Sequence, residues 1–228
     1  MAINRTVVTN RRLVLDYGYC LDFSAANAKV TIASAAALNP TIFSIAAWFK
    51  PGALTANDQP IIGKYSTASG KRGFQLTLKA SGFVMGSVSF DGNSDTTITG
   101  TVPIKPAEWI HVVLTFDGTN LKLYFNSVLN KTTPASGSLV STTTDFSVNH
   151  IFDFADHYGT GKIDEVIFTS ASMTQADVDN LYFRKIRPAS LIIDWKFDEN
   201  TGSSATDSSG NGRTGTISNA TYSNDTVM

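Results

Sequence analysis

The sequence predicts an all-β protein, a β-sandwich of two antiparallel sheets with one short helix. Apolar and polar residues alternate in many short segments, and this period of two is typical of strands that bury one face. Turn-forming residues recur roughly every 8–12 positions, which favours antiparallel strands over βαβ units. Only residues 174–186 have the pattern of a helix. A single sandwich fits the 228 residues, since a chain of this length buries roughly 70% of its unfolded surface.

The clearest strand pattern lies at residues 74–78. There Phe74, Leu76 and Leu78 alternate with Gln75 and Thr77. Other segments with this alternation are 30–32, 42–48 and 84–90. The aromatic residues at alternating strand positions are expected in the core: Phe43, Phe74, Phe90, Phe116 and Phe125. Trp48 and Trp195 are expected to pack between the two sheets.

A β-hairpin is predicted over residues 110–125. Residues 110–116 form a nearly continuous apolar run, and 121–125 alternate between apolar and polar positions. Asp117, Gly118, Thr119 and Asn120 join the two segments. A short polar connection that contains Asp-Gly between two strand patterns is a strong local signal for a hairpin.

The predicted helix begins and ends with recognisable signals. Thr174 can cap its first turn, and Asp177 stands in the capping-box position. Basic residues near its end and Pro188 after it favour termination there. The apolar face would consist of Ala176, Val178, Leu181 and Tyr182.

The segment 191–222 has the character of a domain's beginning, although it lies at the end of the chain. An apolar strand that contains Trp195 and Phe197 leads into the turn-rich run Asp-Ser-Ser-Gly-Asn-Gly at 207–212. We expect both aromatic side chains to fill the sandwich. Residues 1–228 are then one domain, in which 1–18 form an N-terminal arm or edge strand and 189–228 complete the sandwich.

Five motifs together resemble the laminin-G-like, or concanavalin A-like, jelly-roll family. They are Trp-Lys-Phe-Asp-Glu at 195–199 with the turn at 207–212, and the segments 19–32, 43–51, 109–126 and 161–168. The resemblance implies a jelly-roll sandwich. The motif that opens family members comes last here, so the chain is expected to be circularly permuted or to exchange this strand with a neighbouring chain.

Composition and charge narrow the classes of function. The net charge is −1, so nothing favours nucleic acid or an anionic membrane as a partner. No apolar run reaches the about 18 residues of a membrane span, and the N-terminus lacks the apolar core of a signal peptide. We expect synthesis in a cytoplasm and display on a virion or another extracellular assembly. Charged residues make up 16% of the chain against a typical ~25%, and this neutral polar surface suits such a location.

Catalytic patterns are weak. The only cysteine, Cys20, is expected to be a buried small apolar residue, and His111 is expected to be structural. The resembled fold includes glycosidases whose paired carboxylates stand two residues apart on one strand. Asp164 and Glu165 are adjacent and should point to opposite faces of a strand. We therefore expect a protein that is not an enzyme, with glycoside hydrolase as the weaker alternative.

Calcium is the one cofactor that the sequence suggests. The turn at 207–212 is rich in oxygen ligands, of which Ca²⁺ takes six to eight. The resemblance implies a site where this turn approaches the acid of a closing strand. The expected ligands are Asp164, Asp207 and Asn211, with Glu199 as an additional one. Alternatively, Asp207 and Asn211 only bind the local backbone of the turn.

Glycan binding is the common non-enzymatic activity of the resembled family. Sugars stack on exposed aromatic rings, so aromatic residues in loops are the candidates. Tyr65 follows a strand, and Tyr158 comes directly after Asp156 and His157. These four residues form the predicted ligand site; the alternative is that they are exposed without a function.

The sequence therefore predicts a non-catalytic binding or structural module. The first candidate is a surface component of a virion, a capsid decoration or fibre protein, with a glycan-adhesive role. The alternative is a free-standing carbohydrate-binding, lectin-like domain. Expected partners are a glycan or cell-surface polysaccharide, capsid or tail proteins, and further copies of the chain.

Overall fold

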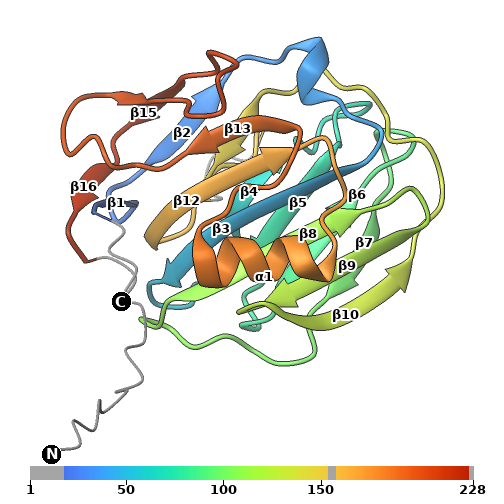
Figure 1. The fold of residues 1–228 in the computed structure, drawn as a ribbon, viewed down its shortest axis with the longest axis horizontal. Helices are drawn as coiled ribbons and strands as arrows, with labels where there is room; N and C mark the ends of the chain where they lie inside the picture. The colour runs from blue at the N-terminus through green and yellow to red at the C-terminus, as the bar shows by residue number, and fades with distance from the viewer. Residues whose placement is uncertain (1–17, 154–157, 226–228) are drawn as a thin grey trace, which may run out of the picture.

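Two antiparallel β-sheets face each other and one α-helix lies on the outside (Figure 1). The structure, a computed structural model, describes residues 18–153 and 158–225. The predicted all-β sandwich with a single short helix is therefore confirmed for the described residues. The expected N-terminal arm, apart from Gly18, lies outside them.

The two sheets, called sheet A and sheet B, have eight strands each among the described residues. Sheet A runs in the order β10 (Val128–Pro134), β9 (Asn120–Phe125), β8 (Ile110–Phe116), β3 (Phe43–Pro51), β12 (Gly161–Thr169), β1 (Cys20–Asp22) and β16 (Thr221–Ser223), and β13 (Leu191–Trp195) also pairs with β12. Sheet B runs in the order β14 (Ser204–Ala205), β15 (Gly215–Ser218), β2 (Lys29–Ile32), β11 (Phe146–Val148), β4 (Gln59–Lys64), β5 (Phe74–Leu78), β6 (Val84–Val88) and β7 (Thr96–Thr99). A 3₁₀ turn, η1 (Ala36–Leu38), follows β2.

The predicted hairpin is present as β8 and β9. Asp117 closes it, because its Oδ1 accepts hydrogen bonds from the backbone N–H groups of Thr119 (2.9 Å) and Asn120 (2.7 Å). Gly118 has a φ of 92°, which a side chain would disfavour. Local turn chemistry thus sets the register of two central strands of sheet A.

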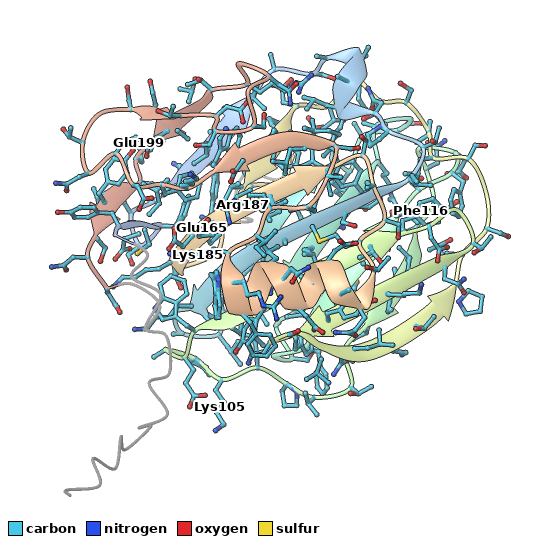
Figure 2. All side chains as sticks on the ribbon, in the orientation of Figure 1. Lys105, Phe116, Glu165, Lys185, Arg187 and Glu199 are labelled. Carbon is cyan, nitrogen blue, oxygen red and sulfur yellow. The ribbon has the colours of Figure 1, made fainter. Side chains whose placement is uncertain are left out.

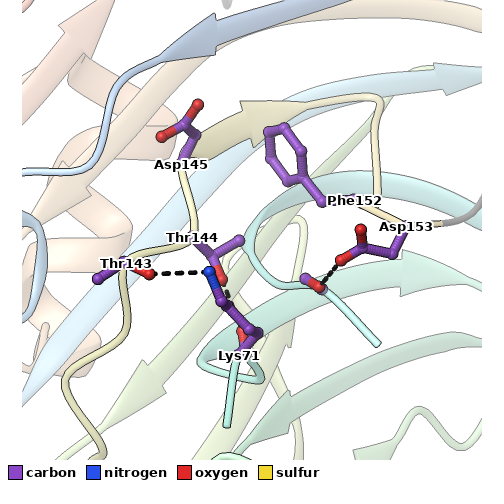
Figure 3. A pocket seen from close by; sticks show the side chains of 7 residues that line it. Lys71, Thr143, Thr144, Asp145, Phe152 and Asp153 are labelled. Atoms are coloured by element: carbon purple, nitrogen blue, oxygen red, sulfur yellow. Dashed lines mark hydrogen bonds between the residues drawn. The ribbon is translucent and has the colours of Figure 1, made fainter. Parts of the chain in front are cut away.

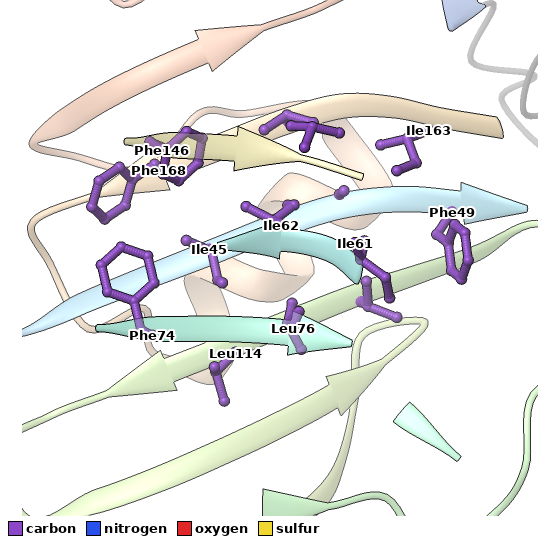
Figure 4. Packing of buried hydrophobic residues seen from close by; sticks show 14 of the residues in the cluster. Ile45, Phe49, Ile61, Ile62, Phe74, Leu76, Leu114, Phe146, Ile163 and Phe168 are labelled. Carbon is purple, nitrogen blue, oxygen red and sulfur yellow. The ribbon is translucent and has the colours of Figure 1, made fainter. Parts of the chain in front are cut away.

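The hydrophobic core lies between the sheets (Figure 4). Apolar side chains at alternating positions of each strand meet there, for example Ile45 and Leu114 from sheet A and Leu76 from sheet B, all fully buried. Aromatic rings fill one part of this core. Phe146 stacks on Phe168 with ring centroids 5.2 Å apart. The core prediction is confirmed for the strand phenylalanines, although Phe90 is only partly buried at its edge.

The C-terminal segment pairs within its own chain and contributes to both sheets. In sheet A, β13 pairs with β12 and β16 pairs with β1. In sheet B, β15 pairs with β2. Trp195 and Phe197 have no exposed surface and belong to the core. The indole N–H of Trp195 donates to the carbonyl of Arg213 (2.8 Å). A Cβ on Gly215 would approach the Trp195 ring to 2.7 Å, so only glycine fits against this ring.

Strand β12 carries a β-bulge that divides its edge between two partners. The register with β3 shifts between Asp164 and Ile167, and Glu165 has a φ of 52°. Before the bulge, β12 pairs with β1, and beyond it with β13. Strands β1 and β13 therefore lie end to end along one side of β12. A bulge commonly redirects side chains at the end of a paired stretch in this way.

Helix α1 (Gln175–Arg184) covers the outer face of sheet A (Figure 1). The predicted capping box is present: Thr174 Oγ1 accepts from the N–H of Asp177, and Asp177 Oδ2 accepts from the N–H of Thr174. Val178 and Leu181 are buried against the sheet, whereas Ala176, expected on this face, is exposed.

The predicted position of Trp48 was wrong. Trp48 lies on the outer face of sheet A beneath α1 and not between the sheets. Its ring centroid is 5.3 Å from that of Tyr182 in the helix and 5.1 Å from that of His111 in β8. The helix buries this face, so β3 has apolar residues on both sides and its alternation does not identify the core side.

Burial confirms the expectation for Cys20, and His111, which was expected to be structural, is also buried. Cys20 and His111 are 0% and 2% exposed. Burial raises the pKa of the Cys20 thiol to about 12 and lowers the pKa of His111 to about 3. Among the described residues, no helix has the length and apolarity needed to span a membrane.

Candidate functional site

A polar pocket of about 200 Å³ lies where three loops meet at one end of sheet B (Figure 3). The loops are the β4–β5 connection, the segment before β11, and the segment after β11. The pocket is called the Lys71 pocket, and its lining consists of Ser66, Lys71, Thr143, Thr144, Asp145, Phe152 and Asp153. Because β11, β4 and β5 are neighbours in sheet B, the sheet order brings together residues that are distant in sequence.

Hydrogen bonds between the loops fix the walls of the Lys71 pocket (Figure 3). Lys71 Nζ donates to Thr143 Oγ1 (3.0 Å), and Thr144 Oγ1 donates to the carbonyl of Lys71 (2.8 Å). Ser66 Oγ donates to Asp153 Oδ2 on the opposite side. The pocket thus presents one ammonium group, two carboxylates, hydroxyls and one aromatic ring, that of Phe152.

A buried lysine lies beneath this region. Lys64, at the end of β4, is 1% exposed. Its Nζ donates to Ser34 Oγ (2.9 Å), to the carbonyl (2.7 Å) and Oγ1 (3.2 Å) of Thr142, and to the carbonyl of Thr144. Burial lowers the pKa of Lys64 to about 8. The ammonium group therefore holds the segment before β11 in place from below, and hydrogen bonds to a charged donor are the stronger kind.

Of the four residues of the predicted ligand site, the structure describes Tyr65 and Tyr158. Tyr65 directly follows β4 as expected, but its ring is not free for a sugar, because the side chain is 6% exposed and its hydroxyl donates to Asp95 Oδ2 (2.6 Å). Tyr158 is half-buried and stacks on His150 with centroids 4.9 Å apart. Asp156 and His157 lie outside the described residues. Burial, with a smaller effect of Lys29, lowers the pKa of His150 to about 4, so this ring is neutral at physiological pH.

Two of the predicted calcium ligands are brought together by one turn. Ser209 Oγ donates to Asp207 Oδ2 (2.8 Å) and accepts from Asn211 Nδ2 (2.9 Å). Asp207 also accepts from the N–H groups of Asp194 and Arg213, and Asn211 donates to the carbonyl of Leu191. These contacts match the alternative in which both residues order the turn and attach it to β13.

The other two predicted ligands make separate contacts. Glu199 accepts from the N–H of Thr206 (2.6 Å) and from the hydroxyl of Tyr222 (3.0 Å). Asp164 is fully buried in β12, where burial and then Glu165 raise the pKa of its carboxyl well above its usual value. No group of three or more His, Cys, Asp or Glu residues in the described part of the chain could hold a metal. These contacts do not form one set of calcium ligands, and calcium binding stays a prediction.

The bulge in β12 changes the expected geometry of Asp164 and Glu165. Alternation placed them on opposite faces, but the shifted register lets both reach the outer side of sheet A. Asp164 lies opposite Trp48 in the register of β12 with β3. The Glu165 carboxylate accepts a hydrogen bond from Arg187 (Figure 2). Arg187 also bonds Asp194 (3.1 Å). Both carboxylates are buried, at 0% and 6% exposure, so they have little contact with solvent.

The Lys71 pocket was not predicted from the sequence. Its residues lie in polar loops without a distinctive motif, and residues 132–144 suggested only a loop rich in serine and threonine. The nearest signal was the prediction that the loop after β4 and the loop around Tyr158 carry the ligand site. Both loops adjoin the pocket, through Ser66 and Phe152, but different side chains line it.

Comparisons with known proteins show which family the sequence matches and which solved structures have a similar fold. The sequence matches the family Laminin_G_3, described as the concanavalin A-like lectin/glucanases superfamily, over residues 24–179. No curated protein matches the chain by sequence.

Among solved structures, a candidate carbohydrate-binding protein from Bacteroides ovatus ATCC 8483 is similar with a TM-score of 0.73 and 17% identity over 92% of this chain and 60% of that one. The heptameric SAP-like pentraxin of Limulus polyphemus has a TM-score of 0.65 and 13% identity, and the match covers 90% of this chain and 94% of the pentraxin chain. A structure of botulinum neurotoxin type C, whose cell entry depends on interaction with two ganglioside molecules, has a TM-score of 0.54 and 17% identity. This match covers 72% of this chain and 41% of the neurotoxin chain. At these identities the likeness shows the fold alone.

Proposed function

The chain belongs to the concanavalin A-like lectin/glucanases superfamily, and we propose that it is a non-catalytic module that binds a glycan in the Lys71 pocket. The lining of the pocket carries the proposal. Sugar hydroxyls are both donors and acceptors, and the carboxylates, the ammonium group and the threonine hydroxyls of the pocket complement them. The Phe152 ring offers an apolar surface for the C–H face of a sugar ring.

The similar structures support the proposal from a second side. The Bacteroides ovatus protein is named for carbohydrate binding, and cell entry of the neurotoxin depends on interaction with two ganglioside molecules. This chain spans 60% of the length of the Bacteroides ovatus protein, so the proposal concerns one binding module and not the activity of a larger protein.

A glycan array tests this function. We expect the folded protein to bind a subset of glycans, and the Lys71→Ala and Phe152→Ala variants to lose at least about tenfold in affinity, because each removes one kind of pocket contact. Lys105→Ala is the matched control, because Lys105 is 77% exposed in its side chain, does not line the Lys71 pocket and forms an ion pair with the exposed Glu108. An array without hits for the folded protein would refute the proposal, and hits that the pocket variants leave unchanged would place binding elsewhere.

A structural role on a virion surface is the second candidate. The observation that favours it is the edge of sheet A, where Val128 and Leu129 of β10 are 68% and 45% exposed. Exposed apolar side chains on an edge strand can contact a neighbouring subunit. Size-exclusion chromatography with light scattering tests self-assembly: we expect an oligomer that Val128→Lys dissociates. A strict monomer would remove the self-assembling form of this role.

A further inference from the structure

A second, larger depression adjoins the Lys71 pocket. It has a volume of about 490 Å³ and lies between the segment that follows β2 and the segment that precedes β11. It is called the Ala36 depression, and its lining includes Ser34, Ala35, Ala36, Asn39 and Ser141. Thr143 and Asp145 line both hollows, so the two hollows are adjacent; these two shared residues are called the ridge.

The chemistry of the two hollows differs. The Lys71 pocket contains Lys71, Asp145 and Asp153, whereas Asp145 is the only charged residue that lines the Ala36 depression. The remaining lining of the depression consists of alanine methyl groups, hydroxyls and one amide. Lys64 lies beneath the depression, but it is 1% exposed and its ammonium group is already bonded to Ser34, Thr142 and Thr144. The charge that a ligand meets in the depression is therefore the Asp145 carboxylate. A neutral molecule with hydroxyl groups and C–H faces fits this surface.

The walls of the Ala36 depression are tied to each other before any ligand arrives. Ser34 Oγ donates to the carbonyl of Thr142 (3.3 Å), and Asn39 Oδ1 accepts from the N–H of Thr142 (3.1 Å). Lys64 binds both Ser34 and Thr142 from below. A surface that is already ordered loses less conformational entropy when it binds, which favours affinity.

The ridge itself offers an acceptor. Asp145 Oδ1 accepts from the N–H of Ser34 (2.8 Å). Its second oxygen, Oδ2, accepts no hydrogen bond from the described residues, and the carboxylate points away from the Lys71–Thr143 contact (Figure 3). A charged acceptor at the junction can bind a hydroxyl of a ligand that lies across the ridge.

The volumes set the size of the ligand. Pockets for small ligands commonly have about 300–1,000 Å³, so the Lys71 pocket alone, at about 200 Å³, is small, and the Ala36 depression falls within that range. We infer that the glycan is a neutral oligosaccharide that spans both hollows across Asp145. This inference rests on the proposed glycan binding and adds the length and charge of the ligand.

The experiment measures affinity against chain length. Gluco-, manno- and galacto-oligosaccharides of one to four units are titrated, together with sulfated and sialylated forms. We expect affinity to rise at least about tenfold between one and three neutral units, since each further sugar adds contacts. Ala36→Trp, which fills the depression, should abolish that gain and leave binding of the single sugar unchanged.

Two variants make the result specific. Ala37→Trp is the matched control, because Ala37 is an exposed neighbour in the same 3₁₀ turn that does not line the depression; it should retain the full gain. Ser141→Arg, on the opposite wall, replaces Ala36→Trp if the latter does not fold. Affinity independent of length, or tighter binding of anionic forms, would overturn this inference alone. No binding of any glycan by the folded protein would overturn the proposed function, and the inference with it.

Discussion

The strongest structural prediction concerns Trp195, the aromatic anchor of the C-terminal segment. Its side chain has no exposed surface, lies edge-on to Phe146 with centroids 5.7 Å apart, and donates to the carbonyl of Arg213. Replacing a buried tryptophan with alanine costs about 3–5 kcal/mol of unfolding free energy. The unpaired Arg213 carbonyl adds about 1 kcal/mol. The expected loss for Trp195→Ala is therefore about 5 kcal/mol, against the about 5–15 kcal/mol typical of a folded protein.

Urea denaturation followed by far-UV circular dichroism measures this loss without relying on tryptophan fluorescence. With a urea m-value of about 2.5 kcal/mol/M, a loss of about 5 kcal/mol lowers the midpoint by about 2 M. Trp195→Phe keeps most of the apolar volume and loses the hydrogen bond, so we expect about 1–2 kcal/mol. Phe183→Ala is the control, because Phe183 is 59% exposed, and its cost should stay within about 0.5 kcal/mol. Equal midpoints for Trp195→Ala and Phe183→Ala would refute the reasoning.

Three further predictions follow from the fold. Deleting residues 189–228 removes strands from both sheets and should abolish cooperative thermal unfolding; a truncated protein that melts near the full-length one would contradict this. Arg187→Met should cost about 3–5 kcal/mol in urea titrations because Glu165 and Asp194 lose their shared buried cation, whereas exposed Arg184→Met should cost at most about 0.5 kcal/mol. The folded Lys64 has a pKa of about 8 and its ordinary value is 10.5, so unfolding takes up a proton between these values and the unfolding free energy rises with pH across that window. In urea titrations from pH 7 to 10, the unfolding free energy of Lys64→Met should lack this rise. If the variant keeps the same slope of unfolding free energy against pH as the unchanged protein, Lys64 is not its cause.

Local patterns in the sequence were sufficient for much of the fold. The β8–β9 hairpin and helix α1 depend on turn and capping residues that lie next to the segments they end, such as Asp117 and Thr174. The period of two identified the core side of β5 because only one face of that strand packs between the sheets. It failed for Trp48 because α1 buries the other face of β3.

The candidate site depends on contacts that no local pattern contains. Lys71, Asp145 and Phe152 meet because β11 and β4 are adjacent in sheet B. The buried position of Lys64 is likewise set by carbonyl groups far along the chain, those of Thr142 and Thr144. The Asp164–Glu165 bulge also escaped prediction, since two adjacent carboxylates in a strand pattern give no sign of a shifted register.

The pairing of β1 with β16 and of β2 with β15 has a consequence for how the protein folds during synthesis. Cys20 and Ser223 contact each other although they lie 203 positions apart in the sequence, and β2 must wait for β15 before it has a partner on that side. Contacts between such distant residues slow folding. A nascent chain in which residues 191–223 are not yet synthesised exposes an unpaired strand edge and the cavity that Trp195 fills, and exposed edges of this kind favour aggregation. Chaperones that shield sheet edges should therefore increase the yield of folded protein.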